Sequence, residues 1–373
     1  MLETNLQETA LKQGVSRRDF LKFCSMMAGV LALPRSYSTY IEQALAAPKR
    51  LPVIWLELQD CAGCTEALLR ATAPTVSQLV LDVLSVDYHE TIMAAAGDLA
   101  EAAKQASIKA GGYLLVVEGS IPTGDGGVYC TVGGKTALQL LEEAASNAVA
   151  VVAVGNCASF GGWPKAGPNP TGATYVSELV TDKPVMNLPG CPYNPVNLTA
   201  AIVHFLTFGE LPAMDDLHRP LFAYGARIHD NCPRRGHFDA GEFVVAWGDE
   251  GHNKGFCLYK MGCKGPVTFH NCPAVGYNDG TSWPIKAGHG CIACSEPDFW
   301  ELGVYNLADL QQYAPPTTYA PVQLPTQKVD PATAGVIGAM AGVAAGAAGV
   351  AAYKALSKSD EDESAPPAQN AEK

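Results

Sequence analysis

Long basic segments are missing from this chain of 373 residues, which has 25 Lys and Arg against 37 Asp and Glu and a net charge of −12. Nucleic-acid binding needs a basic surface to neutralise phosphates, so the composition argues against that function class. The chain also lacks an internal repeat, and Gly124–Gly134, although rich in glycine, lacks the spacing of a phosphate-binding loop. What it does have is twelve cysteines, too many for an ordinary cytosolic enzyme of this size.

The first 46 residues have the pattern of an export signal rather than of a folded domain. Arg17 and Arg18 precede a mildly apolar run, Phe23–Leu33, and Ala44–Ala46 supplies the small residues of a signal-peptidase site. We predict a twin-arginine signal, which exports proteins already folded around their cofactors, rather than a basic turn before an ordinary helix. Removing this segment removes Cys24 and leaves eleven cysteines, an odd number that disulfides within one chain cannot fully pair.

An uncharged run near the other end, Ala332–Tyr353, has 22 residues and is long enough to cross a bilayer as a helix. We predict a linker at 316–331, a single membrane-spanning helix at 332–353 and a cytoplasmic tail at 354–373. Lys354 and Lys358 then lie on the cytoplasmic side, as the positive-inside tendency expects, and the folded body lies on the periplasmic side of the cytoplasmic membrane. A buried core helix is the alternative interpretation of the run.

The segment 47–215 alternates apolar runs with helical patterns and predicts an α/β domain with a doubly wound parallel sheet. The predicted strands are Val53–Leu58, Leu79–Val86, Tyr113–Val117, Val149–Val154 and Val185–Leu188, and the predicted helices are Thr91–Lys109, Lys135–Asn147 and Pro195–Phe208. From 216 to 315 the periodicity disappears and Gly, Cys, His, Trp and Pro crowd together. This pattern predicts a mostly irregular domain that metal ligation stabilises.

Four cysteines follow three of the predicted strands. Cys61 and Cys64 form a C-x-x-C after the first strand, Cys157 follows the fourth strand, and Cys191 follows the fifth. Because the carboxyl ends of parallel strands lie at one edge of a sheet, we expect these four thiols, the sheet-edge group, to lie together. Four thiolates can hold a [4Fe–4S] cluster or a structural zinc ion.

Two further groups lie in the irregular domain. The histidine group consists of His229, Cys232, Cys257 and Cys263, a set suited to a four-metal cluster or to zinc; alone, His229 would more often be a hydrogen-bonded structural residue. The three-cysteine group consists of Cys272, Cys291 and Cys294, a number awkward for tetrahedral zinc but suited to a three-iron cluster. Cys130 is left over and is interpreted as an ordinary buried thiol. Three clusters in one chain indicate serial electron transfer.

These motifs resemble the small subunit of [NiFe] hydrogenases, specifically its membrane-bound, periplasm-facing uptake group. The resemblance runs from the signal to the C-terminal helix, and its most specific segments are Asp60-Cys61-Ala62-Gly63-Cys64-Thr65-Glu66, Gly155-Asn156-Cys157-Ala158, Pro189-Gly190-Cys191-Pro192, Phe238-Asp239-Ala240-Gly241, Gly262-Cys263-Lys264-Gly265-Pro266, and Trp283-Pro284 before Gly288-His289-Gly290-Cys291-Ile292-Ala293-Cys294.

The resemblance implies a flavodoxin-like domain, a proximal [4Fe–4S] cluster on the sheet-edge group and a distal [4Fe–4S] cluster on the histidine group. It also implies a medial [3Fe–4S] cluster on the three-cysteine group, with Pro284 at the position where a fourth cysteine is absent. Gly63 and Gly162 stand where oxygen-tolerant members carry two additional cysteines. Glu66 matches a family glutamate, for which proton transfer, a place in the subunit interface, or a simple helix N-terminal carboxylate are all open.

The implied partners are a large subunit that carries the nickel–iron centre and a membrane cytochrome b or other quinone-linked acceptor. This chain lacks the paired C-x-x-C motifs that hold the nickel–iron centre, so it is expected to relay electrons from H2 oxidation rather than to split H2 itself. The main alternative is a membrane-anchored, multicluster ferredoxin-type carrier without a hydrogenase partner, and co-purification of a nickel-containing protein would separate the two. A zinc- and disulfide-stabilised surface protein is a second alternative, which the brown colour of an iron–sulfur protein would exclude.

Overall fold

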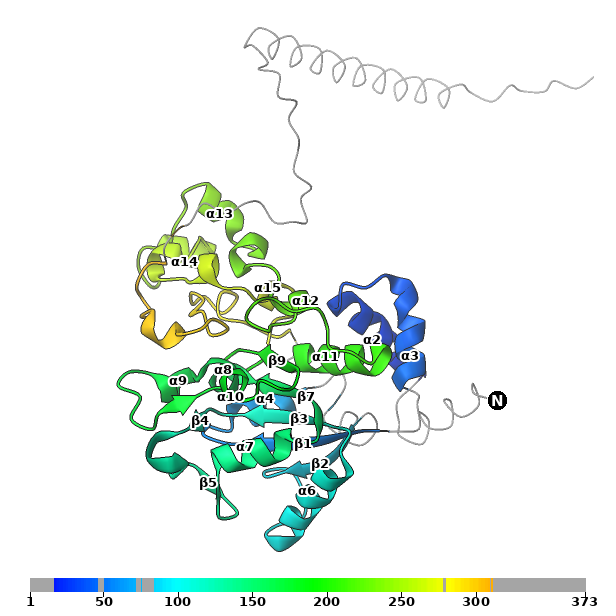
Figure 1. The fold of residues 1–373 in the computed structure, drawn as a ribbon. Helices are drawn as coiled ribbons and strands as arrows, with labels where there is room; N and C mark the ends of the chain where they lie inside the picture. The colour runs from blue at the N-terminus through cyan, green and yellow to red at the C-terminus, as the bar shows by residue number, and fades with distance from the viewer. Residues whose placement is uncertain are drawn as a thin grey trace, which may run out of the picture. The chain divides into compact units, whose positions relative to one another are not determined.

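The computed structural model describes residues 17–45, 50–71, 75, 84–277, 280–308 and 310 of the chain, shown in Figure 1. The predicted linker, membrane-spanning helix and cytoplasmic tail lie outside these residues. Within the described part, no helix is both long enough and apolar enough to cross a bilayer.

A five-stranded parallel sheet forms the centre of the N-terminal body. Its strands are β1 (Leu51–Glu57), β2 (Leu84–His89), β3 (Tyr113–Glu118), β7 (Ala148–Val154) and β9 (Val185–Leu188), in the spatial order β2-β1-β3-β7-β9. All four neighbouring pairs are parallel. Their near-continuous apolar sequences fit strands that are covered on both faces. The predicted α/β fold with a parallel sheet is therefore confirmed, and the strand order is the 2-1-3-4-5 order of flavodoxin-like sheets.

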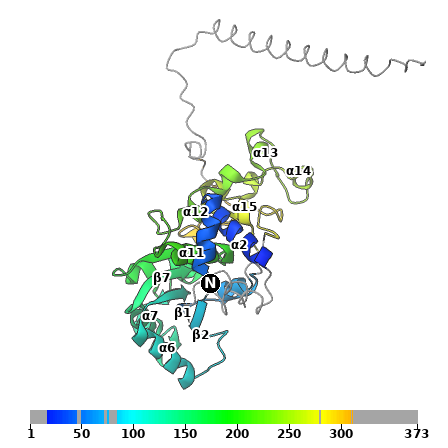
Figure 2. The ribbon, with the colours of Figure 1, turned by 90° about the vertical axis from the view of Figure 1, so that its right-hand side faces the viewer.

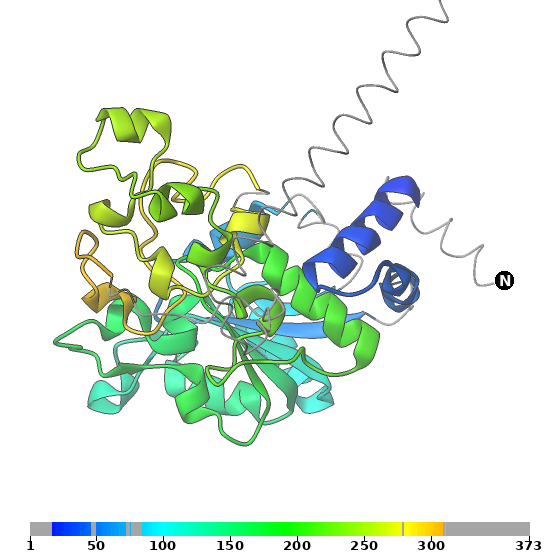
Figure 3. The ribbon, with the colours of Figure 1, turned by 90° about the horizontal axis from the view of Figure 1, so that it is seen from above.

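Helices cover both faces of this sheet, as Figures 1 and 3 show. Alternate residues of β1 point to opposite faces: Ile54 belongs to the core under α6 (Asp98–Ala110) and α7 (Ala137–Ala145). Trp55 belongs to the core under α4 (Gly63–Leu69) and α11 (Pro195–Phe208).

Local signals in the sequence fix where two of these helices begin and end. Thr136 and Gln139 form a reciprocal capping box at the start of α7. Asn194 accepts a hydrogen bond from the Val196 N–H at the start of α11, which has Pro195 in its first turn and ends at Gly209 in the left-handed conformation.

Shorter elements fill the connections of this body. They are η3 (Gly124–Gly127), α8 (Gly155–Phe160), α9 (Gly162–Lys165), α10 (Val176–Leu179), α12 (Leu221–Tyr224) and the two-residue strands β4 (Ile121–Pro122), β5 (Thr131–Val132), β6 (Lys135–Thr136) and β8 (Ala173–Thr174). The helix predicted from Thr91 begins only at Asp98, after Gly97, whose φ of 57° is in the left-handed region.

The segment after α12 is mostly irregular, as predicted. Its elements in the described part are short: η4 (Ile228–Asn231), α13 (Arg235–Asp239), α14 (Glu250–Lys254), η5 (Tyr259–Met261), η6 (Gly265–Val267), α15 (Cys272–Val275) and η7 (Phe299–Glu301). Its core combines ordinary apolar side chains such as Ile228 and Trp283 with the buried cysteines 263, 272 and 291. Cysteine thiols thus occupy positions that a self-sufficient core would give to aliphatic side chains.

Polar contacts join the irregular segment to the sheet domain. The side-chain amide of Asn156, which follows β7, donates to the backbone carbonyls of Cys294 and Glu296 at 2.9 Å each. Arg219, only 4% exposed, forms an ion pair with Glu296 at 2.9 Å. These contacts place the 291–294 motif against the carboxyl edge of the sheet.

The N-terminal segment folds onto the body in the full chain. Two helices, α2 (Arg17–Val30) and α3 (Ser38–Leu45), with η1 (Arg35–Tyr37) between them, pack on the outer face of α11, the side that Figure 2 turns toward the viewer. Cys24 is fully buried there against Ala200 and Val203. The sequence predicts a targeting segment rather than a part of the fold, and the structure adds that this segment covers an apolar helix face.

Candidate metal centres

The sheet-edge group lies where the parallel topology predicts it. Cys61 and Cys64 stand at the start of α4 just after β1, Cys157 lies in α8 directly after β7, and Cys191 follows β9. The backbone turns sharply beside Cys61 and shortly before Cys157, because Ala62 has a φ of 56° and Gly155 has a φ of 81°. A Cβ atom on Gly155 would lie 2.4 Å from the sulfur of Cys64, so the close approach of the first and fourth strand ends requires glycine there.

Electrostatic coupling shows that these four thiols face one another. Burial, with the neighbouring thiols of Cys191 and Cys61, raises the pKa of Cys157 to about 12. Burial, with Cys294 and Cys61 nearby, raises the pKa of Cys191 to about 11. Burial also raises the pKa of Cys64, with Glu118, Cys157 and Cys191 adding to the effect. Thiols in such surroundings ionise readily only when a bound cation compensates the charge, as metal ligation does.

A buried carboxylate that the sequence analysis missed holds the Cys61–Cys64 loop. Glu118, 1% exposed at the end of β3, accepts hydrogen bonds from the backbone N–H groups of Cys64 (3.0 Å) and Thr65 (3.1 Å). It also accepts from the hydroxyl of Thr65 at 2.6 Å and the indole of Trp55 at 3.2 Å. The available signal was an acidic residue at the end of an otherwise apolar strand.

A second buried carboxylate extends this network away from the cysteines. Glu57 accepts from the hydroxyls of Thr65 (2.9 Å) and Thr91 (2.6 Å) and lies 3.7 Å from the ring of His89. Burial lowers the pKa of His89, and the ring stacks on Trp55 with centroids 5.0 Å apart.

Glu66 lies apart from this network. It is in the first turn of α4, its side chain is 56% exposed, and it forms an ion pair with Arg70 at 2.7 Å, four residues along the helix. This geometry fits a helix N-terminal carboxylate on an exposed surface.

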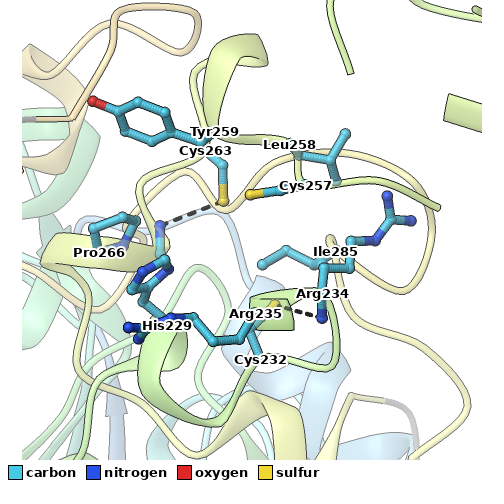
Figure 4. A pocket seen from close by; sticks show the side chains of 11 residues that line it. His229, Cys232, Arg234, Arg235, Cys257, Leu258, Tyr259, Cys263, Pro266 and Ile285 are labelled. Carbon is cyan, nitrogen blue, oxygen red and sulfur yellow. Dashed lines mark hydrogen bonds between the residues drawn. The ribbon is translucent and has the colours of Figure 1, made fainter. Parts of the chain in front are cut away.

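The histidine group lines one cavity, drawn in Figure 4. The cavity is partly open to solvent. Its wall contains all four predicted ligands; Arg234, Arg235, Tyr259, Pro266 and Ile285 complete much of the rest. Burial and the nearby Arg235 lower the pKa of His229, which keeps the imidazole neutral, the form that ligates metals.

Backbone N–H groups point at the sulfurs of this group. Arg234 N–H lies 3.4 Å from the sulfur of Cys232, and Gly265 N–H lies 3.5 Å from that of Cys263, as the dashed lines in Figure 4 mark. The ring of His229 packs edge-on against Phe238 with centroids 4.5 Å apart. Burial raises the pKa of Cys257 to about 11. The cavity therefore brings three thiols and one imidazole together in one wall, the donor set of a four-metal cluster or a zinc site.

The three-cysteine group is the most deeply buried of the three. Cys272 and Cys291 are 4% and 6% exposed, and burial together with the neighbouring cysteines raises the pKa of each. Pro284 lies exposed between the buried residues Trp283 and Ile285. Cys130, by contrast, packs beside the sheet core away from all three groups, consistent with an ordinary thiol.

Short contacts connect the three groups in a series. Cys191 of the sheet-edge group and Cys294 are electrostatic neighbours, and Asn156, next to Cys157 of the same group, donates to the Cys294 carbonyl at 2.9 Å. At the other end of the motif, the Cys291 backbone N–H lies 3.3 Å from the sulfur of Cys263 in the histidine group. The three-cysteine group therefore lies between the other two.

The donor spacing favours clusters over single ions. Within the described residues, no three or more His, Cys, Asp or Glu side chains converge closely enough to hold one metal ion. A tetrahedral zinc ion with Zn–S bonds of about 2.3 Å would need its sulfurs within about 4 Å of one another. In an iron–sulfur cluster each cysteine ligates a different iron, so its sulfurs stand around a wider cage. The three donor groups, with three or four thiols and imidazoles each, have the ligand chemistry of such clusters.

Comparison with known proteins agrees with this arrangement. Residues 61–205 match the family described as the NADH ubiquinone oxidoreductase 20 Kd subunit, and residues 224–305 match the family described as the C-terminal part of the NiFe/NiFeSe hydrogenase small subunit. The chain is 51% identical over 294 residues to the quinone-reactive Ni/Fe-hydrogenase small chain of Wolinella succinogenes, covering 78% of this chain and 83% of the relative. It is 45% identical to the hydrogenase-2 small chain of Escherichia coli K12, covering 81% and 82%.

A solved structure gives the same result for the fold. The reduced, active Ni-Fe-Se hydrogenase from Desulfomicrobium baculatum contains a chain that matches with a TM-score of 0.65 at 36% identity, over 70% of this chain and 100% of that one. The chain therefore belongs to the family of [NiFe] hydrogenase small subunits and is the electron-transfer subunit of such a hydrogenase complex.

Proposed function

We propose that this chain relays electrons from H2 oxidation through three iron–sulfur clusters to an acceptor in the membrane. The sheet-edge group would hold a proximal [4Fe–4S] cluster, the three-cysteine group a medial [3Fe–4S] cluster and the histidine group a distal [4Fe–4S] cluster. Such clusters, when bound, accept and pass on single electrons. The observation that carries the proposal is the serial contact of the three groups through Cys191–Cys294 and Cys291–Cys263.

The exposed residues at the two ends of the relay indicate which site would face which partner. Cys61 and Cys191 are exposed at the sheet edge, so the proximal site opens on the surface that would meet the large subunit with its nickel–iron centre. Glu66 lies on the same α4 turn, and we place it at this interface. At the far end, the cavity around His229 opens to solvent, where an acceptor could receive electrons. N–H groups aimed at the sulfurs of Cys232 and Cys263 would stabilise their thiolates there.

The two ends of the chain complete the proposal. Residues 1–46 would be a twin-arginine export signal, 47–215 the flavodoxin-like domain, 216–315 the cluster domain, 316–331 a linker, 332–353 a membrane helix and 354–373 a cytoplasmic tail. A relative that is named quinone-reactive supports a membrane acceptor, a cytochrome b or quinone-linked partner, and a periplasmic position of the body.

Iron content and spin resonance of the complex purified with its large subunit test the cluster assignment. We expect about twelve iron atoms per heterodimer, four in each of two clusters, three in the third and one in the nickel–iron centre of the large subunit, and a three-iron signal in the oxidised protein. Pro284→Cys should replace that signal with a four-iron centre of lower potential, while Cys130→Ser, the matched control outside the three groups, should change neither. A fully loaded wild type without a three-iron signal would refute the assignment.

A truncation tests the membrane acceptor separately. Ending the chain after Pro331 should release a cluster-loaded heterodimer that still reduces dyes with H2 but reduces quinone much more slowly. A truncated complex that stays with the membranes in high salt would place the anchor elsewhere.

A further inference from the structure

Two aromatic residues next to the three-cysteine group carry buried polar atoms without a protein partner. His270 is 2% exposed, and its Nδ1 lies 2.9 Å from the sulfur of Cys272. Its Nε2 and the hydroxyl of Tyr277 are buried, and neither has a hydrogen-bond partner within the described part of the chain. Because buried polar groups in native proteins are normally paired, the two atoms point to an acceptor or donor that belongs to this site.

The rings are held rigidly. His270 stacks on Tyr277 with centroids 6.0 Å apart and an interplanar angle of 20°. It also meets Tyr224 edge-on at 5.0 Å. The hydroxyl of Tyr224 donates to the Pro189 carbonyl at 2.8 Å, so this third ring has no polar group to offer the cysteines. Tyr277 therefore differs from Tyr224 in having a hydroxyl that is free among the described residues, and His270 places its Nδ1 against a cysteine sulfur.

The chemistry of a ligated thiolate fixes the roles. A thiolate bound to iron has no proton and can only accept, so the contact with Cys272 requires the proton of His270 to be on Nδ1. The Tyr277 hydroxyl forms no hydrogen bond to the protein that the structure describes, and the thiols of Cys272 and Cys294 are its electrostatic neighbours, so it is a free donor beside them.

We propose that His270 and Tyr277 are positioning residues that donate N–H and O–H to the thiolates of the three-cysteine group and thereby raise the reduction potential of its cluster. The proposal rests on the assignment of the medial cluster above. Reduction adds negative charge that spreads onto the sulfurs, so donors aimed at them stabilise the reduced form more than the oxidised form.

Redox titration of the complex, followed by the three-iron resonance signal, tests this inference. Tyr277→Phe and His270→Phe keep the ring volume and remove the donor. At a fixed ambient potential we expect each to lower the reduced-to-oxidised ratio of the medial cluster about tenfold, which is about 59 mV for a one-electron couple. Tyr224→Phe is the matched control. It also removes a tyrosine hydroxyl next to His270, but this hydroxyl donates to the Pro189 carbonyl and not to a cysteine.

His270→Asn provides a rescue, because its amide N–H can take the place of Nδ1–H; its potential should stay near the wild type even if His270→Phe loses iron. A Tyr277→Phe midpoint that matches Tyr224→Phe and the wild type would overturn the inference if His270→Phe were also unshifted or, where His270→Phe loses iron, if His270→Asn failed to restore the wild-type midpoint; either result would leave the cluster assignment intact. Absence of the three-iron signal in the loaded wild type would overturn the assignment and the inference with it.

Discussion

Replacing the buried Glu118 by alanine should destabilise the sheet-edge site more than replacing any surface or loop carboxylate of the N-terminal body. The substitution leaves three N–H groups without an acceptor: the backbone groups of Cys64 and Thr65 and the indole of Trp55. The Thr65 hydroxyl keeps Glu57 as an alternative acceptor at 2.9 Å. Each buried unpaired donor costs about 1–3 kcal/mol, so even the lower limit gives a loss of about 3 kcal/mol.

This loss is measurable as heat stability and iron content. For a body of this size 1 kcal/mol corresponds to about 2–4 °C, so Glu118→Ala should lower the melting temperature of the purified complex by about 6–12 °C at one scan rate. Glu118→Gln keeps one acceptor oxygen and should lose less than half as much. Glu142→Ala, an exposed carboxylate on α7, is the matched control and should stay within about 0.5 kcal/mol of the wild type. If Glu118→Ala melted within roughly 2 °C of Glu142→Ala and kept its full iron content, the reasoning from unpaired donors would be wrong.

Three further expectations follow from other parts of the structure. In the uncleaved chain, Cys24 should be alkylated slowly because it is fully buried, and Val203→Glu on α11 should speed the alkylation. Mass spectrometry of the tryptic peptide 23–35 measures the rate, and equal rates in the wild type and the variant would contradict the packing. Burial and Glu57 raise the pKa of Glu90 to about 7, so the stability that the protonated carboxyl contributes to folding is complete below about pH 4.5 and is lost as the pH rises through 7. Glu90→Gln should therefore make the melting temperature fall less steeply with pH over this range, and an unchanged slope would refute the prediction. Gly162→Ala places a Cβ 2.5 Å from the Cys157 sulfur at a φ of +58° and should lower the iron content of the proximal site. Gly63→Ala places its Cβ 3.1 Å from the Cys61 sulfur and should keep most of that iron. Equal iron contents in the two variants would argue against the crowding.

The sheet and the sheet-edge group were predictable because both depend on local periodicity and one topological rule. Val185–Leu188 and Pro195–Phe208 match the observed elements at both ends, since a buried apolar run and a capped helix leave clear signals. Once the strands are parallel, Cys157 and Cys191 must lie at the same edge as the C-x-x-C.

The rest depended on contacts that sequence periodicity does not encode. Glu118 looks like the polar end of a strand, and only the fold shows that it faces the N–H groups of Cys64 and Thr65, more than fifty residues away in sequence. His270 likewise looks like an ordinary loop residue until the fold places it against Cys272. The packing of Cys24 on α11 joins two segments more than 170 residues apart, for which the only hint was that α11 has apolar residues on more than one side.

The distance between the three cysteine groups depends on the short motif Cys291–Cys294. Cys291 faces Cys263 of the histidine group, and Cys294 faces Cys191 of the sheet-edge group. Three residues of extended chain span at most about 11 Å, and Ala293, with a φ of 64°, turns the chain within this stretch. The same C-x-x-C therefore contains two of the proposed medial ligands and determines how closely the outer cysteine groups approach the middle one. Because Asn156 holds the carbonyls of Cys294 and Glu296, the position of this bridge is set by the sheet and not by the irregular segment that contains it.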